Sequence, residues 1–467
     1  MAKVDIFREE LTEQIPDSES GPPIAETDTK KLFLKMFNSG GLLPIGIKVD
    51  TPRAQQEMAK FEKTVMVLDG KNEEGMLEAL RSLYKRFPKL AEELGLQCSN
   101  DLINIAQELG INVKQDAEED WLQALKSHGS AVYFPTGVIG EKIVFEKMRY
   151  FSPEIERVIL HASEWRLASE SERAMADNSH LISIGLSVGS ELAHAALLKG
   201  ITSFTLADPG ILHADLKGRL GLGYDERWLG ANKAAFVALQ ILRLYPYAII
   251  DLFPDGIIPS NVSQVMNPHN LTAEMISGEG RLLVAEEADA WDAKKSPREQ
   301  LHTVIKDIVP WLLVTLGDVE NRVVGVVEDV STLPFQGWME QFGDPFGDQL
   351  VQNKGELAGL LAVVGGFESI PLRLLQLLAD GEIGGGPNAE ISRVPQSREA
   401  TLLASAIFLG ILRIVGNGGE VNGFFNLDVD ATIDAHRMND AAKNRQAIKT
   451  LRKKMNQEVF GKPSITG

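Results

Sequence analysis

The chain has 467 residues, of which 44% are hydrophobic and 24% are charged, and its formal net charge is -18. A strongly negative surface repels phosphate, so this charge excludes nucleic acid as a main partner. The single cysteine, Cys98, excludes an internal disulfide and any paired-cysteine zinc site, which favours a reducing compartment. Because the N-terminus is charged where a signal peptide is apolar, we expect a cytoplasmic protein without a membrane partner.

The first 130 residues divide into a tail and a helical segment. Residues 1–28 are polar and acidic and contain three prolines, which predicts a flexible tail. Residues 29–130 carry apolar side chains at helical spacing, for example Leu80, Leu83 and Phe87. We therefore predict a helical N-terminal domain over residues 29–130, in which no motif indicates a chemical function.

Residues 131–330 alternate short apolar runs with helical segments. Two strands around a Gly/Pro turn open this region, at Ala131–Phe134 and Lys142–Phe145. Later strands are expected at Ala248–Phe253, Leu282–Ala285, Trp311–Leu316 and Val323–Val327. Strands that alternate with helices predict an α/β fold with a mostly parallel sheet covered on both faces. A ligand of such a sheet binds at the carboxyl ends of its strands.

Within this region, the stretch from Leu181 to Asp208 carries the signature of a nucleotide site. A short apolar strand leads into a Gly/Ser turn and a small-residue helix, and the turn contains Gly185, Ser187 and Gly189. Glycine allows the backbone to approach a phosphate, and the free N–H groups of a first helical turn bind anions. Asp208 ends the following strand, about 20 residues after the turn, where a carboxylate binds a ribose hydroxyl. Serine stands at two of the usual glycine positions, so a plain glycine-rich turn is the alternative.

Three charged residues follow the glycine turn at the points where a bound nucleotide needs them. Arg219 lies in the loop after Asp208, Lys233 opens the next helix, and Asp289 follows a predicted strand. An arginine and a lysine supply the cations that a triphosphate requires, and an aspartate at a strand end can hold Mg²⁺. Each residue alone is compatible with an ordinary surface charge. Their succession at strand ends favours a site.

Residues 331–467 form a helix-rich C-terminal region that completes or flanks the core. Apolar helices are expected at Gly355–Val364, Leu372–Leu378 and Glu399–Ile414, and an edge strand at Phe424–Val429. The longest apolar run, Leu402–Leu412, is too short to span a bilayer.

Taken in order, these motifs resemble those of the ThiF/MoeB-type adenylyltransferases, relatives of the ubiquitin-activating enzymes, and in particular a bacterial branch of that family. The turn IGLSVGS is similar to a variant of the family's glycine turn, and ADPG resembles the segment with the ribose-binding aspartate. The segments DLKGR, GANKAA and EADAWDAK resemble the Asn-Leu-Asn-Arg motif, the Asn-Lys motif and the magnesium-binding segment. The resemblance covers roughly residues 131–329 and implies a Rossmann-like sheet, with residues 131–330 as the nucleotide-binding domain.

The resemblance also implies a reaction. Such enzymes bind MgATP and attack its α-phosphorus with a carboxylate, usually the C-terminus of a peptide or protein, to give an acyl-adenylate and pyrophosphate. Carried onto this chain, Asp208 binds the ribose, Arg219 and Lys233 bind the phosphates, and Asp289 binds Mg²⁺. Family members are commonly homodimers in which an arginine enters the partner's site, and Arg166 is the candidate for that role.

The chain departs from the family pattern at several positions. Gly210 replaces a second aspartate, and Asp215 and Lys217 stand where asparagines are usual. No cysteine follows Cys98, so this region cannot perform the family's thioester step, and the adenylate must pass to an external nucleophile such as an amine or a thiol. The expected carboxylate substrate is the C-terminus of a peptide or protein, including a small carrier protein, or a small acid, and the expected process is peptide or natural-product modification.

Two other functions stay open at this point. The same glycine turn serves NAD(P)-binding oxidoreductases, although Arg219 and Lys233 then have no evident role. The altered motif positions are also compatible with a ThiF-like scaffold that keeps the fold without the chemistry.

Overall fold

The computed structural model describes residues 26–41, 45–47, 59–60, 63, 65–69, 107–110, 117–139, 142–161, 168–213, 226–267, 272–288, 291–319, 322–337 and 398–428. The chain forms two compact units. The first unit comprises Met1–Ala168, Gly210–Lys217 and Leu222–Ala248, and the second comprises Ser169–Pro209, Gly218–Gly221 and Ile249–Gly467. Most of the predicted tail and of residues 70–116 lies outside the described residues, so the flexible tail, the helical N-terminal domain and the predicted domain limits stay predictions.

The first unit contains a four-stranded sheet with the order β1-β3-β4-β2. Its strands are β1 (Ile45–Ile47), β2 (Met66–Asp69), β3 (Ser130–Ile139) and β4 (Lys142–Tyr150). The hairpin β3–β4 forms its centre, β1 pairs antiparallel with β3, and β2 pairs parallel with β4. Two short strands of this sheet thus come from residues 29–130, where the sequence pattern indicates helices.

Helices accompany this sheet in the first unit, among them α2 (Glu26–Asn38), α6 (Ala117–His128), α7 (Pro153–His161) and α10 (Lys233–Leu244). The end of α10 is tied to the hairpin, because the Tyr150 hydroxyl donates to the carbonyl of Arg243 at 2.6 Å. The Arg243 guanidinium also pairs with Glu146 of β4. These contacts join segments that lie about a hundred residues apart in the sequence.

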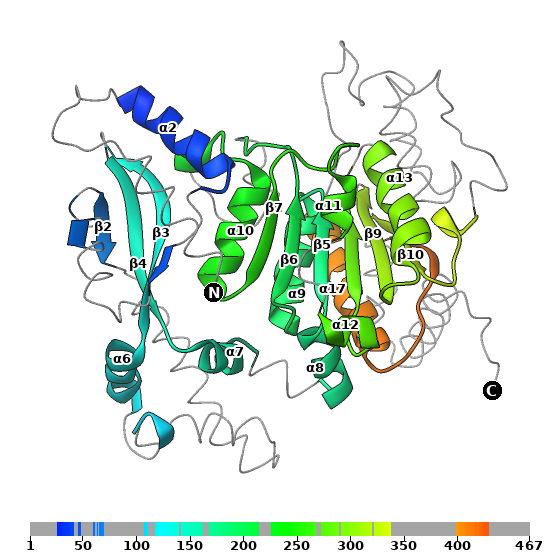
Figure 1. Cartoon of the computed structure of the whole chain (residues 1–467), viewed down its shortest axis with the longest axis horizontal. Coiled ribbons are helices and arrows are strands. Elements are labelled where there is room, and N and C mark those ends of the chain that lie inside the picture. The colour runs from blue at the N-terminus through cyan, green and yellow to red at the C-terminus, as the bar shows by residue number, and fades with distance from the viewer. Residues whose placement is uncertain are drawn as a thin grey trace, which may run out of the picture. The chain divides into compact units, whose positions relative to one another are not determined.

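The second unit contains a seven-stranded sheet with the order β11-β10-β9-β8-β5-β6-β7 (Figure 1). Its strands are β5 (His180–Ile184), β6 (Ser203–Ala207), β7 (Ile249–Phe253), β8 (Leu282–Glu286), β9 (Trp311–Val319), β10 (Arg322–Asp329) and β11 (Gly423–Asp428). Neighbours from β7 to β9 pair in parallel, and β10 and β11 pair antiparallel. The predicted α/β fold with a mostly parallel Rossmann-like sheet is confirmed.

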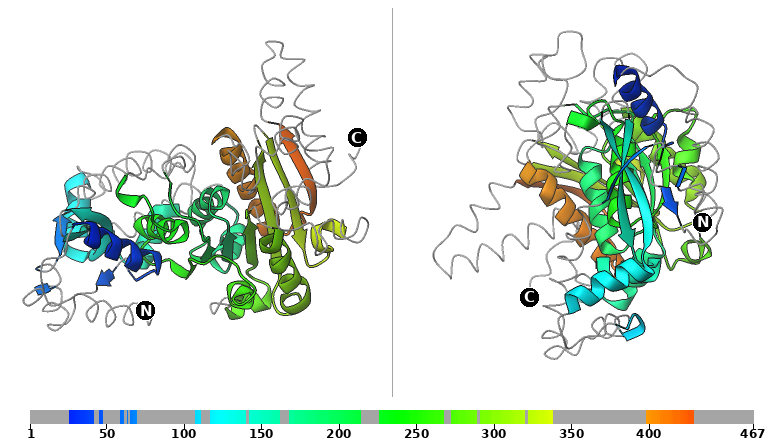
Figure 2. Two further views of the ribbon diagram at one scale, coloured as in Figure 1. Left: turned by 90° about the horizontal axis from the view of Figure 1, so that it is seen from above. Right: turned by 90° about the vertical axis from the view of Figure 1, so that its left-hand side faces the viewer.

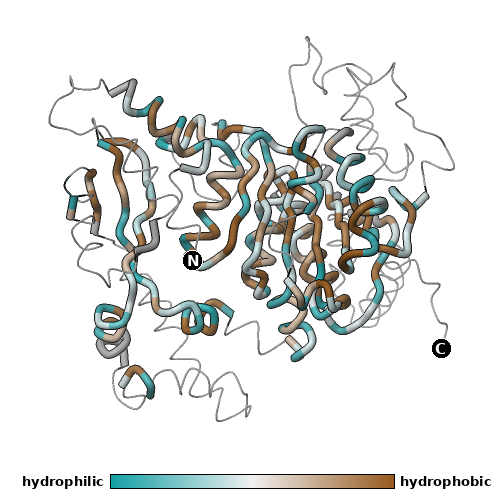
Figure 3. The backbone as a smooth tube through the Cα atoms, in the orientation of Figure 1, coloured by the Kyte–Doolittle hydropathy of each residue, from teal (hydrophilic) through white to brown (hydrophobic). Residues whose placement is uncertain are grey.

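Helices cover both faces of this sheet, and its central strands β5, β6 and β8 are buried along nearly their whole length, with apolar residues in the majority (Figure 3). One face carries α11 (Val262–Met266), α12 (Ala273–Ser277), α13 (Trp291–Gln300) and the π-helical turn η3 (Leu301–Ile305). Val265, Met275 and Ile305 from these helices pack on buried residues of β5, β8 and β9. The other face carries α8 (Glu170–Asp177), α9 (Val188–Lys199) and α17 (Arg398–Gly416), and Figure 2 shows α17 beside the antiparallel end of the sheet.

Helix α17 (Arg398–Gly416) corresponds to the helix predicted at Glu399–Ile414 and is longer than the apolar run Leu402–Leu412 within it. An 18-residue window of the helix, Glu399–Gly416, is long and apolar enough to cross a membrane by length and composition alone. In the second unit this helix packs against α9 and β9, and Ala400, Ala404, Phe408 and Ile411 along it are fully buried. A core helix of this kind meets the same length and composition test.

A buried histidine links the amino ends of β5 and β6. The ring nitrogens of His180 lie 2.7 Å from the Ser203 hydroxyl and 2.8 Å from the Thr205 hydroxyl. Burial lowers the pKa of His180 to about 4, and the carboxylate of Asp251 opposes this shift. The folded protein therefore holds this imidazole neutral where the unfolded chain protonates it.

We predict that this histidine contributes to acid sensitivity. The pKa of His180 is about 4 in the folded protein and about 6.5 in the unfolded chain. Above the unfolded pKa both states hold a neutral imidazole, and the free energy of unfolding keeps its full value. As the pH falls from the unfolded pKa to the folded pKa, the unfolded chain binds a proton that the folded protein does not, which lowers the free energy of unfolding by on the order of 3 kcal/mol. Denaturant unfolding between pH about 7 and pH about 4 should show a shallower loss of stability in His180→Gln than in the unsubstituted chain. Identical pH dependence of the two proteins would contradict the prediction.

Candidate functional site

The glycine turn between β5 and α9 is built around Gly185, whose φ of +79° favours glycine. A Cβ atom at this position would lie 2.6 Å from the amide nitrogen of Ala288 and 2.6 Å from the carbonyl carbon of Glu287. The Gly185 amide donates to the carbonyl of Ala207, at the end of β6, at 2.9 Å. Two independent constraints, the backbone angle and the close approach of the loop after β8, therefore require glycine here.

Helix α9 packs against β5 through Gly189, in the first turn of the helix. A Cβ atom at Gly189 would lie 2.8 Å from the Ser183 hydroxyl oxygen, and that hydroxyl donates to the Gly189 carbonyl at 3.2 Å. Close helix–strand packing is the role of the third glycine in a dinucleotide-binding turn. In this chain Ser190 stands at the position of that third glycine. The preceding residue, Gly189, provides the close packing instead, so serine is tolerated at residue 190.

The first backbone N–H groups of α9 lie next to the glycine turn. Ser187 precedes the helix with a half-buried side chain that does not cap it. Unsatisfied N–H groups at a helix N-terminus favour an anion, and the helix dipole adds to that preference. The combination of strand, glycine turn and helix is suited to a phosphate.

Asp208, at the carboxyl end of β6, fastens this turn from the other side. Its Oδ2 accepts the amide of Leu186 at 2.5 Å, and its own amide donates to Phe253, at the end of β7, at 3.3 Å. The residue is 5% exposed. A buried carboxylate thus lies directly beside the glycine turn, and Gly185, Ser187, Gly189 and Asp208 come together in the second unit.

The glycine turn and Asp208 lie where the order of the strands along the sheet reverses. From β5 the chain continues through α9 to β6 on one side, whereas β8 lies on the other side and leads into α13 on the opposite face. Ligands of open α/β sheets bind outside the carboxyl ends of the strands at such a switch point. The candidate site is therefore the edge formed by the ends of β5, β6 and β8.

Two glutamates at the end of β8 belong to this edge, and the sequence analysis did not identify them. The Glu287 amide donates to Ile184 at 2.7 Å, and its carboxylate accepts the amide of Leu316 in β9 at 2.7 Å. The Glu286 carboxylate accepts the amide of Ala288 at 3.0 Å. The sequence offered one signal for these residues, namely two consecutive glutamates at the end of an apolar strand. A buried carboxylate requires hydrogen-bonding partners, so such a pair predicts a polar cluster at this strand end.

The partners of Glu286 come from α13 and from β9. Lys294 and Arg298 each donate to its carboxylate at 3.1 Å, and the Thr315 hydroxyl donates at 3.2 Å. Arg298 also binds Glu328 of β10 at 2.6 Å. Burial raises the pKa of Glu328, and the Arg298 guanidinium opposes this shift.

The described acidic residues of this edge do not form a magnesium site. Glu286 and Glu287 are bound by protein donors, and in the described part of the chain no three His, Cys, Asp or Glu side chains are grouped as metal ligands. Asp289, Arg219 and Arg166 lie outside the described residues. Their roles as magnesium ligand, phosphate ligand and partner-site arginine stay predictions.

Lys233 belongs to the first unit, where it is the first residue of α10 and is 7% exposed. The side chain of Asn232 caps this helix by accepting the amide of Ala235 at 3.1 Å. Asn38, at the end of α2, holds the same segment: its side chain accepts the Asn232 amide at 2.7 Å and donates to Gly230 at 3.2 Å. The N-terminal helix α2 thus fixes the start of the helix that carries Lys233.

No protein-family model matches the chain, and no curated protein does. Solved structures that it is similar to include the Escherichia coli tRNA N6-threonylcarbamoyladenosine dehydratase TcdA (16% identity, TM-score 0.34, covering 56% of this chain and 94% of that chain). They also include E. coli MccB with MccA (10%, 0.35, 60% and 71%) and PaaA (14%, 0.36, 75% and 85%). MccB with ATP and TcdA with AMP also match.

These proteins have ThiF/MoeB-type adenylyltransferase-like folds, the family that the motifs of this chain resemble. Each TM-score is below 0.5, so the fold of this chain rests on its own strand order.

We predict that Gly185→Ala destabilises the protein more than Gly278→Ala. Gly278 has a similar φ of +91°, and no described atom lies within 4 Å of a Cβ built there, so its substitution isolates the backbone strain. That strain costs about 1–2 kcal/mol. Gly185→Ala adds the displacement of residues 287–288, for which about 1–3 kcal/mol is typical. Denaturant unfolding measures both, and equal losses would show that the close approach to Ala288 is unimportant.

Proposed function

We propose that this protein is an ATP-dependent adenylyltransferase that activates a carboxylate. One observation carries the proposal: the glycine turn at the N-terminus of α9 lies beside the buried carboxylate of Asp208 at the switch point of the sheet. Backbone N–H groups suit the phosphates, and the carboxylate suits the ribose hydroxyls. The order of the sequence motifs favours adenylation over other uses of such a nucleotide site.

In the proposed reaction, a carboxylate oxygen of the substrate attacks the α-phosphorus of ATP. A bond forms between that oxygen and the α-phosphorus, the bond from the α-phosphorus to the bridging oxygen breaks, and pyrophosphate leaves with the electron pair. Arg219 and Lys233 neutralise the charge that develops on the phosphates, and Arg166 of a second copy completes the site in a homodimer. Asp289 is the proposed ligand of Mg²⁺.

The acyl-adenylate passes to an external nucleophile. The one cysteine of the chain is Cys98, so the region after it has no thiol to form a thioester. The proposed substrate is a peptide, and modification of its C-terminal carboxylate is the proposed outcome.

A dinucleotide such as NAD is the second candidate ligand. A carboxylate at the end of the second strand, beside a glycine turn, also binds the ribose of NAD. The geometry around Asp208 therefore supports both ligands, and a binding experiment decides between them.

We expect the purified protein to bind MgATP in a calorimetric titration, with little heat from NAD. Asp208→Asn keeps an acceptor for the Leu186 amide but removes the charge. It should weaken MgATP binding about 10- to 100-fold, because a hydrogen bond to a charged group contributes about 1.5–3 kcal/mol. Lys233→Met should weaken binding similarly, whereas Lys142→Met, at the exposed start of β4, should not. If the protein bound NAD and not MgATP, the site would be that of an oxidoreductase, and the adenylyltransferase proposal would be wrong.

The chemical step is tested by ATP–pyrophosphate exchange. A peptide substrate with a free C-terminal carboxylate should stimulate exchange of labelled pyrophosphate into ATP, because adenylation is reversible until the acyl group is transferred. The same peptide with a C-terminal amide is the matched control and should be inactive. Equal exchange with both peptides would exclude the terminal carboxylate as the group that is activated.

A further inference from the structure

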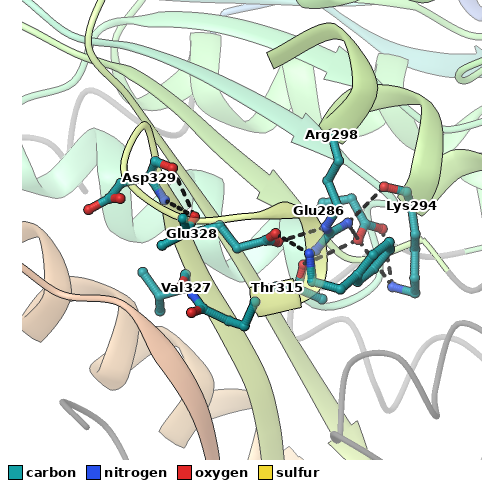
Figure 4. Close-up of polar contacts among 10 residues, drawn as sticks. Glu286, Lys294, Arg298, Thr315, Val327, Glu328 and Asp329 are labelled. Carbon is teal, nitrogen blue, oxygen red and sulfur yellow. Dashed lines mark hydrogen bonds and ion pairs between the residues drawn. The ribbon is translucent and has the colours of Figure 1, made fainter. Parts of the chain in front are cut away.

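Behind the loop after β8 lies a group of four buried charged side chains, which we call the charge network: Glu286, Lys294, Arg298 and Glu328 (Figure 4). Both glutamates are fully buried, Arg298 is 1% exposed and Lys294 is 5% exposed. Removing charges from water is costly, and an apolar core of the same shape is often at least as stable. A network of this kind therefore calls for an explanation other than stability.

Glu286 connects the network to the backbone of the candidate site. Its Oε1 accepts both the Lys294 ammonium, at 3.1 Å, and the Ala288 amide, at 3.0 Å. Its Oε2 accepts Arg298 at 3.1 Å. Helix α13 thus holds one carboxylate with two cations, and that carboxylate holds the amide of Ala288.

Ala288 in turn sets the geometry of the glycine turn. A Cβ atom at Gly185 would lie 2.6 Å from its amide nitrogen and 2.8 Å from its Cα atom, so the two backbones touch. The preceding residue, Glu287, is held at its amide by Ile184 and at its carboxylate by Leu316.

Arg298 extends the network to a strained turn after β10. Its guanidinium carbon lies 4.1 Å from the centre of the Phe335 ring, and Glu328 accepts the Phe335 amide at 2.5 Å. Phe335 and Gln336 have φ angles of +52° and +56°, which side-chain-bearing residues adopt infrequently. Backbone of this kind persists where its surroundings hold it. The network therefore holds both the turn at 335–337 and the loop at 287–288.

We propose that Lys294 and Arg298 are positioning residues of the nucleotide site, which act through Glu286 to hold residues 287–288 against the glycine turn. This inference rests on the proposed nucleotide-binding function. It predicts that loss of the Lys294 charge loosens the loop and weakens nucleotide binding, although Lys294 itself belongs to the buried network and not to the ligand surface.

The test combines Lys294→Met, the conservative Lys294→Arg and the control Lys295→Met. Lys295 is the neighbouring residue on α13; its side chain is 35% exposed and pairs with Glu299 at 3.9 Å. Should Lys294→Met be recovered unfolded, Lys294→Gln replaces it, because glutamine keeps a donor for Glu286 without the charge. Hydrogen exchange is measured on peptides covering residues 283–292, without nucleotide, and the dissociation constant for MgATP is measured on the folded protein.

We expect exchange in these peptides to be about tenfold faster in Lys294→Met than in Lys295→Met. We also expect MgATP binding to be about tenfold weaker, a difference of roughly 1.4 kcal/mol, and Lys294→Arg to restore both. A residue that only stabilises the fold would lower the melting temperature and leave the dissociation constant of the folded fraction unchanged. Unchanged MgATP affinity in a folded Lys294→Met protein would overturn the inference.

Failure of the proposed function gives a different pattern. If the unsubstituted protein does not bind MgATP, nucleotide binding is wrong, and the exchange experiment alone decides whether the network positions the loop. Faster exchange in Lys294→Met then supports the positioning role, and unchanged exchange overturns it.

Discussion

The contact between Gly185 and residue 288 is the constraint on which the candidate site depends. The two backbones approach so closely that a single methyl group at residue 185 would overlap the amide of Ala288. The contact lies just beyond the paired ends of β5 and β8, at the point where the strand order reverses. Asp208 connects the same turn to the end of β6 through the Leu186 amide, so the ends of three strands meet at this turn.

The buried charges next to this contact explain how the loop after β8 is held. The buried carboxylate of Glu286 pairs with two cations from α13 and accepts one backbone amide, that of Ala288, next to the glycine turn. Because a buried ion pair is often no more stable than an apolar core of the same shape, we explain this one by the backbone geometry that it holds. The same reasoning applies to Glu328 and Arg298, which hold a turn of left-handed residues after β10.

Much of the second unit could be predicted because its signals are local. The short apolar strand predicted before the glycine turn is β5, and Asp208 directly follows β6 as its spacing indicated. Helix α17 (Arg398–Gly416) was likewise predicted nearly to its ends, at Glu399–Ile414, because its apolar residues recur at helical spacing. The strands β1 and β2 were not predicted, since each is short and exists only through its pairing with a distant hairpin.

By itself, the sequence determined the α/β alternation, the glycine turn and the position of Asp208, because strand periodicity and turn chemistry depend on neighbouring residues. Only the tertiary structure decided that Gly189 replaces a missing glycine, that Glu286 and Glu287 fix the loop after β8, and that Asn38 fixes the start of α10. Each of these depends on contacts between residues that the chain brings together from separate strands and helices. Such contacts leave no periodic pattern in the sequence. A buried carboxylate or amide requires a partner, but the neighbouring residues in the sequence do not identify that partner.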